Sequence, residues 1–216
     1  MADQVHDSLL KEIDEELRQE HYAKLWKKYG NYVIAAAVLL VLAVAGYQGW
    51  RHWDLQTRQE QSVKFANALT LSADKPQDAV QAFAHIGKDG GGYGLLARFQ
   101  EAALTARNGD LAGAVAAYEA IAGDGGVDAL YQDLATLLAV ITQLQTGDPG
   151  QLSQKIAALT AADNPWRYSA QEVGALLAIR SGDKAKAREL LDALIADNGT
   201  PNGLRVRAEA LRAGQD

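Results

Sequence analysis

The sequence predicts an all-α protein that has an N-terminal amphipathic helix, one transmembrane helix and an α-solenoid of helical hairpins. Alanine and leucine dominate, and aromatic residues make up only 7% of the 216 residues, which favours helices over sheet. One uninterrupted apolar stretch near the N-terminus is long enough to cross a bilayer. The rest of the chain repeats a pattern of helix, glycine-aspartate turn and helix. We take the predicted elements in chain order.

Residues 1–31 are predicted to form a cytoplasmic amphipathic helix, with its helical pattern between residues 7 and 29. Apolar side chains recur at helical spacing, which places them on one stripe. Asp7 or Ser8 can cap the start of this helix. The pattern is compatible with a helix on the membrane surface, one docked on a partner, and a solvated helix. The stripe is formed by Leu9, Leu10, Ile13, Leu17, Leu25, Trp26 and Tyr29.

Residues 32–50 are predicted to span the membrane, and no polar side chain occurs between Val33 and Gly46. A helix of this length measures about 28 Å, close to the hydrocarbon thickness of a bilayer. Both ends carry the aromatic and basic residues expected at a membrane–water interface. A buried core helix has no reason to carry such residues at both ends. The predicted interface residues are Lys27, Lys28, Tyr29, Tyr32, Tyr47, Trp50, Arg51 and Trp53.

The same stretch has a second interpretation as a cleaved signal peptide, because the sequence AVA at residues 43–45 resembles a cleavage site. The segment that precedes Tyr32 is long and acidic, which favours an uncleaved signal anchor. The lysines just before the span predict a cytoplasmic N-terminus and a periplasmic C-terminal domain. Ala45 and Gly49 lie on one face of the helix, and small residues at this spacing permit contact with a partner helix in the bilayer. An alanine-rich span also produces such a spacing by chance.

Residues 51–75 are predicted to connect the span to the soluble domain, which occupies residues 76–216. Three segments in this domain resemble one another: DAVQAFAHI from Asp78, GAVAAYEAI from Gly113 and KARELLDAL from Lys186. Each has alanine at its second position and a large side chain at its sixth. We expect the alanine to permit close helix contact and the large side chain to fill the adjacent space. These packing residues are Ala79, Phe83, Ala114, Tyr118, Ala187 and Leu191.

Glycine-aspartate pairs mark the turns at Gly109-Asp110, Gly147-Asp148 and Gly182-Asp183. Glycine ends one helix and aspartate caps the next. The intervals between these pairs are close to the tetratricopeptide period of about 34 residues, and a domain of non-repeating α-hairpins is the alternative. The four prolines lie at predicted helix starts. Soluble helices are expected near 53–72, 76–87, 93–108, 111–122, 127–146, 150–162, 165–181, 184–197 and 201–213.

The sequence predicts no catalytic, metal or cofactor site, so the protein is expected to be a non-enzyme. It contains no cysteine, which excludes thiol catalysis, disulfides and thiolate metal ligands. The four histidines are scattered, and the glycine-rich segment 87–94 lacks the spacing of a phosphate-binding loop. The net charge is −6 without a basic face, which disfavours a nucleic-acid partner.

The overall layout resembles the YfgM-like family of ancillary Sec translocon subunits. Three local sequences carry the resemblance, in addition to the acidic N-terminal helix and the single span. They are GYQGWRHW at residues 46–53, YGLLARFQEA from Tyr93 and ALLAIRSGDKAKAREL from Ala175. The glycine-rich loop and the high alanine content depart from the family pattern and affect the expected binding face.

This resemblance implies a bacterial inner-membrane protein that associates with the SecYEG translocon and with a membrane-anchored periplasmic chaperone of the prolyl-isomerase class. It carries no catalytic residue over to this chain. The expected function is a non-catalytic interaction module that assists the chaperone handling of newly translocated client proteins. The alternative is a structural scaffold of another envelope complex, such as one for outer-membrane protein assembly, without client binding.

Overall fold

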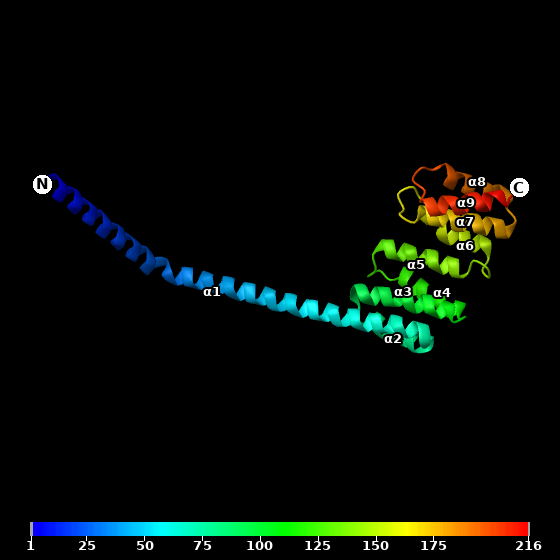
Figure 1. The fold of residues 1–216 in the computed structure, drawn as a ribbon, viewed down its shortest axis with the longest axis horizontal. Coiled ribbons are helices and arrows are strands. Elements are labelled where there is room, and N and C mark those ends of the chain that lie inside the picture. The colour runs from blue at the N-terminus through cyan, green and yellow to red at the C-terminus, as the bar shows by residue number, and fades with distance from the viewer. Residues whose placement is uncertain (1, 216) are drawn as a thin grey trace. The chain divides into compact units, whose positions relative to one another are not determined.

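The computed structural model describes residues 2–215, with side chains from residue 23 onward (Figure 1). The chain forms two compact units, residues 1–60 and residues 61–216, and each is described by itself. The described residues form α-helices and one short 3-10 turn, with no strand among them. The predicted all-α class is therefore confirmed.

Helix α1 (Ala2–Asp74) contains the whole apolar stretch and continues beyond it. It begins before Asp7, the position at which the sequence predicted the start of the first helix. No proline occurs between its ends, so its backbone hydrogen bonding continues through the boundaries proposed at residues 31 and 50. The predicted stripe at Leu9, Leu10, Ile13 and Leu17 lies outside the residues whose side chains are described.

The second unit is a series of helices in which each element packs against the next one in sequence. Its first helix is the end of α1, where Ala68 is buried against α2 and α3. The remaining helices are α2 (Pro76–Lys88), α3 (Gly91–Arg107), α4 (Leu111–Ala122), α5 (Ala129–Thr142), α6 (Pro149–Ile156), α7 (Arg167–Ser181), α8 (Lys184–Ala196) and α9 (Asn202–Ala213), with the 3-10 turn η1 (Ala157–Thr160) after α6.

Aspartate side chains cap the three helices that follow the predicted glycine-aspartate turns. The carboxylate of Asp110 accepts a hydrogen bond from the Gly113 amide at 2.8 Å. Asp183 accepts one from the Lys186 amide at 2.9 Å, and Asp148 caps α6 in the same way. Each bond satisfies an amide that has no partner within its own helix.

Two of the predicted turns have the left-handed backbone that favours glycine. Gly109 has a φ of 93° and Gly182 a φ of 79°, a conformation that costs other residues energy. Gly147 does not adopt it, because α5 already ends at Thr142 and a longer turn precedes α6. The sequence had predicted that α5 continued to residue 146.

Helix α7 begins at Arg167, later than the start that Pro165 indicated. The side-chain oxygen of Asn164 accepts a hydrogen bond from the Trp166 amide at 2.8 Å, which holds residues 164–166 in a turn. The expected helix at 150–162 is also shorter, since α6 changes to the 3-10 turn η1 at Ala157.

The second unit contains a duplication, in which the chain from Pro76 corresponds position by position to the chain from Pro149. Helices α2 to α5 (residues 76–142) form what we call the first copy, and residues 149–215 form the second copy. Pro76 and Pro149 both lie at the first position of a helix. The following equivalent pairs are buried in both copies: Phe83 and Ile156, Ala97 and Ala170, Leu104 and Leu177, Ala114 and Ala187, Tyr118 and Leu191, and Ala135 and Ala208.

The duplication extends to individual hydrogen bonds. Asp124 accepts from the Gly126 amide at 3.0 Å, and its equivalent Asp197 accepts from the Gly199 amide at 2.7 Å. Gln132 donates to the carbonyl of Asp124, and the corresponding Arg205 donates to the carbonyl of Asp197. Matching burial and matching loop bonds show that the paired positions of the two copies are structurally equivalent.

Candidate protein-interaction groove

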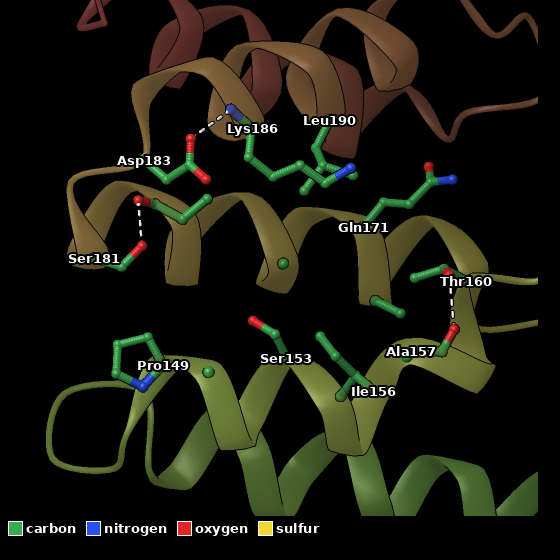
Figure 2. A pocket seen from close by; sticks show the side chains of 14 residues that line it. Pro149, Ser153, Ile156, Ala157, Thr160, Gln171, Ser181, Asp183, Lys186 and Leu190 are labelled. Atoms are coloured by element: carbon green, nitrogen blue, oxygen red, sulfur yellow. Dashed lines mark hydrogen bonds between the residues drawn. The ribbon is translucent and has the colours of Figure 1, made fainter.

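The most developed hollow in the second unit is a groove of about 410 Å³ bounded by α6, α7 and α8. Figure 2 shows α7 between the two flanking helices, with side chains of all three lining the space. We call it the α6–α7–α8 groove. Its volume lies within the range of about 300–1,000 Å³ typical of ligand sites.

Small residues of α7 leave the space open. Ala170, Gly174 and Ala178 lie along the groove at helical spacing. Ile156 of α6 and Leu190 of α8 contribute the larger apolar side chains of the lining. These residues form the apolar part of the groove lining.

Polar residues also line the groove, and most of their groups already have partners. The Ser181 hydroxyl donates to the Ala178 carbonyl at 3.0 Å, and the Thr160 hydroxyl donates to the Ala157 carbonyl at 2.7 Å (Figure 2). Asp183 caps α8. Within the described part of the chain, the hydroxyl of Ser153 and the side-chain amide of Gln171 form no hydrogen bond.

A second, smaller hollow of about 300 Å³ lies between the end of α1 and α3. Leu69 and Ala73 line it from α1, and Gln100, Leu104 and Arg107 line it from α3. Leu69 remains 45% exposed there. This surface is more open to solvent than a packed helix contact.

The predicted interface residues lie on α1 and are exposed. Trp50 is 63% exposed and Trp53 is 64% exposed, although they are large apolar side chains. The ammonium group of Lys28 lies 5.2 Å from the ring centre of Tyr29. Tyr32, Tyr47, Lys27 and Arg51 are also exposed.

Ala45 and Gly49, the predicted contact for a partner helix, share one face of α1 and are exposed. A Cβ atom added at Gly49 would meet nothing within 4 Å. An apolar surface without a covering element in its own unit resembles the lipid-facing side of a spanning helix. Among the described residues, α1 is the helix long and apolar enough to cross a membrane, with a mean hydropathy of 2.0 over its most apolar window.

The residues predicted to pack the repeats are all buried. Ala79, Ala114 and Ala187 have no exposed surface. Phe83 belongs to the core of the first hairpins, where its ring lies 5.5 Å from that of Phe65. Tyr118 contacts Phe99, and Leu191 packs with α9. None of the six lines the α6–α7–α8 groove.

No cluster of three or more potential metal ligands occurs among the described residues. The glycine-rich segment 87–94 includes the end of α2, a turn at residues 89–90 and the start of α3. Gly90 and Gly91 have positive φ values of 73° and 67° there. The turn of this segment lies between two helices, whereas a phosphate-binding loop follows a strand.

The sequence did not predict the groove, although it contains a signal for it. Small residues such as Gly174 indicate space only when the flanking helices are known. Alignment of the two copies, with Pro76 on Pro149, would have shown small or neutral residues where the first copy has larger or charged ones.

This fold and groove define a helical-repeat protein of the class that binds other proteins, here joined to a helix of membrane-spanning length. Residues 23–211 match the family described as the tetratricopeptide repeat-like domain, and the chain belongs to this family. The match includes the apolar stretch as well as the repeats. No curated protein and no solved structure matches the chain.

Proposed function

We propose that the protein is a non-catalytic, membrane-anchored interaction protein of the bacterial inner membrane. One observation carries the proposal: helix α1 continues from an exposed apolar stretch into the first helix of a repeat unit that has an open groove. Tetratricopeptide-like repeats present extended surfaces to other proteins. An anchor that holds such a surface near a membrane partner raises the effective concentration of the two.

We further propose that the anchor associates with the SecYEG translocon and that the repeats act with a periplasmic chaperone of the prolyl-isomerase class on newly translocated proteins. The resemblance to the YfgM-like family supports this assignment. In this arrangement the N-terminus is cytoplasmic, residues 32–50 cross the membrane and the repeats are periplasmic. Ala45 and Gly49 form the proposed contact with a membrane partner, because small residues permit close approach of another helix.

Photocrosslinking in intact membranes tests this proposal. A photoreactive amino acid replaces Gly49 in the span or Leu69 beside the smaller hollow, and the captured proteins are identified by mass spectrometry. Translocon subunits are expected at Gly49, and chaperone or newly translocated proteins at Leu69. Leu40, which is exposed on the same helix, provides a control position in the apolar stretch.

Other captured proteins would contradict specific parts of the proposal. Recovery of outer-membrane assembly components in place of translocon subunits would support the alternative scaffold function. Equal capture at Leu40 and Gly49 would show that the small-residue contact does not exist.

A further inference from the structure

The first and second copies of the repeat unit differ at the α6–α7–α8 groove. The equivalent space in the first copy is filled by a side chain. In the first copy, the side chain of Arg98 packs close to Gly87 of α2, where an added Cβ would lie 3.1 Å from Arg98 Cγ. Its guanidinium group donates to the Ala120 carbonyl at 3.2 Å and to the Asp124 carboxylate at 2.7 Å. Arg98 thus links α3 to the end of α4 and occupies the position of the groove.

The second copy has different residues at the equivalent positions. There Gln171 replaces Arg98, Gly174 replaces Glu101, and Ala178 replaces Thr105. The side chain of Gln171 forms no hydrogen bond with other described residues, whereas Arg98 forms two. The groove therefore results from the residues of the second copy, because the same backbone in the first copy is filled by its own side chains.

The two charged side chains of the groove lining, Asp183 and Lys186, have opposite signs, and both have partners within the chain. The Asp183 carboxylate accepts a hydrogen bond from the backbone amide of Lys186 at 2.9 Å. The ammonium group of Lys186 forms an ion pair with the carboxylate of Glu189 at 2.8 Å. Ala170, Gly174 and Ala178 of α7 form an apolar part of the same lining. Burial of a charged ligand group against such a lining would lack a compensating partner, so the complementary ligand is uncharged.

Two polar side chains of the lining form no hydrogen bond with other described residues and can serve an extended ligand backbone. Figure 2 shows Ser153 on α6 and Gln171 on α7, both with side chains in the groove lining. An extended peptide has backbone amide and carbonyl groups that need hydrogen-bond partners on binding, whereas a helix satisfies its own. The hydroxyl of Ser153 and the amide of Gln171 can supply them.

We propose that the α6–α7–α8 groove binds an extended, uncharged peptide segment with small aliphatic side chains. This inference rests on the proposed function, since it names the chemistry of the client segment. The lining runs along α7 from Ala170 to Ser181, about 16 Å at the helical rise. An extended chain covers this length with about five residues. Such segments are exposed in unfolded proteins.

Peptide binding to the full chain in lipid nanodiscs tests the proposal. The probe is the fluorescein-labelled heptapeptide Thr-Ala-Val-Ser-Val-Ala-Thr, followed by fluorescence anisotropy, with empty nanodiscs to measure binding to lipid. Gly174→Gln fills the groove; a Cβ at this position meets Leu190 Cδ1 at an ordinary 3.4 Å. Binding is expected to weaken by at least about tenfold. Ala193→Gln, at an exposed position of α8 outside the groove, should leave binding unchanged.

Two further comparisons complete the test. Gln171→Ala removes the amide without filling the groove and should weaken binding, and circular dichroism verifies that each variant is folded. A heptapeptide with aspartate or lysine in place of both valines should bind more weakly than the probe. Unchanged binding in folded Gly174→Gln and Gln171→Ala, equal binding of the charged peptides, or binding to empty nanodiscs alone would overturn the proposal.

The result is separable from the test of the proposed function. If the peptide binds the groove but the translocon does not crosslink, the client chemistry stands and the assigned membrane partner is wrong. If the crosslinks appear but Gly174→Gln leaves peptide binding intact, the groove inference fails and the anchored function remains.

Discussion

Arg98 and Gln171 occupy equivalent positions in two copies of one structural unit but have opposite effects on the surface. The guanidinium group of Arg98 forms an ion pair with Asp124 in the first copy. In the second copy the equivalent of Asp124 is Asp197, which is held by the Tyr168 hydroxyl at 3.1 Å. Asp197 therefore does not need a hydrogen bond from Gln171, and the side-chain amide of Gln171 remains available for a ligand.

The bond to Arg98 gives Asp124 a testable effect on stability. The Arg98 hydrogen bond, followed by that from the Gly126 amide, lowers the pKa of Asp124 below its usual range. Because the pKa of Asp124 is lower in the folded state than in the unfolded state, its ionised carboxylate stabilises the fold at pH values above the unfolded pKa of about 3.9. This stabilisation is lost as the pH falls through the folded-state pKa of Asp124.

We therefore expect Asp124→Asn to lower the melting temperature at pH 7 and to have a diminishing effect as the pH falls below about 4. Thermal unfolding followed by circular dichroism between pH 7 and about 2.5 measures this difference. Asp163→Asn is the control, because its exposed carboxylate accepts no hydrogen bond from the described residues. If the difference in melting temperature between Asp124→Asn and wild type stays constant over this pH range, the lowered pKa of Asp124 is contradicted.

At the scale of helices and hairpins, the small residues determine how closely the repeats pack. Ala114 has no exposed surface, and Tyr118 is buried one turn later on the same face of α4. Ala187 and Leu191 have the same arrangement in α8. The regular placement of a small and a large residue follows from close helix packing, in which added volume has little space.

Ala114→Leu is expected to overpack the α3–α4 contact and to lower the free energy of unfolding by about 1–3 kcal/mol. Ala116→Leu on the same helix provides a matched control, since Ala116 is less buried than Ala114. Both variants are compared with wild type by denaturant unfolding of the purified chain. A similar loss of stability in both would show that the effect does not come from the packing position.

The sequence predicted the repeats because their determinants are local. Gly182 and Asp183 specify a turn by backbone conformation and a side-chain cap, whatever surrounds them. The end of α5 was mispredicted because it depends on tertiary contacts. The guanidinium group of Arg180, far along the chain on α7, donates to the carbonyl of Leu144 just after α5. Such a partner cannot be identified from residues 143–147 alone.

The groove was missed for the same physical reason. Its volume depends on the sizes of side chains from three helices, and Gly174 alone predicts only a weaker helix. By contrast, the aromatic residues around the apolar stretch are exposed on α1, and their role at a membrane interface stays a prediction. The proposed roles of Ala45 and Gly49 need a partner helix and stay a prediction.

At the scale of the whole molecule, the proposed orientation determines which compartment each unit can serve. A repeat unit in the periplasm can meet translocated proteins, whereas one in the cytoplasm cannot. The proposal rests on Lys24, Lys27 and Lys28 before the span, since positive residues favour the cytoplasmic side.

Protease accessibility in spheroplasts tests this orientation. With an epitope tag at each end of the chain, added protease should remove the C-terminal tag and digest residues beyond Trp53, while the N-terminal tag stays protected. A cytoplasmic marker protein must survive, which shows that the membrane is intact. Replacing Lys27 and Lys28 with glutamine should increase the fraction of chains with the opposite orientation, because it removes the two cations nearest the span on its N-terminal side. Loss of the N-terminal tag with a protected C-terminal tag in the wild-type chain would reverse the orientation and place the groove in the cytoplasm.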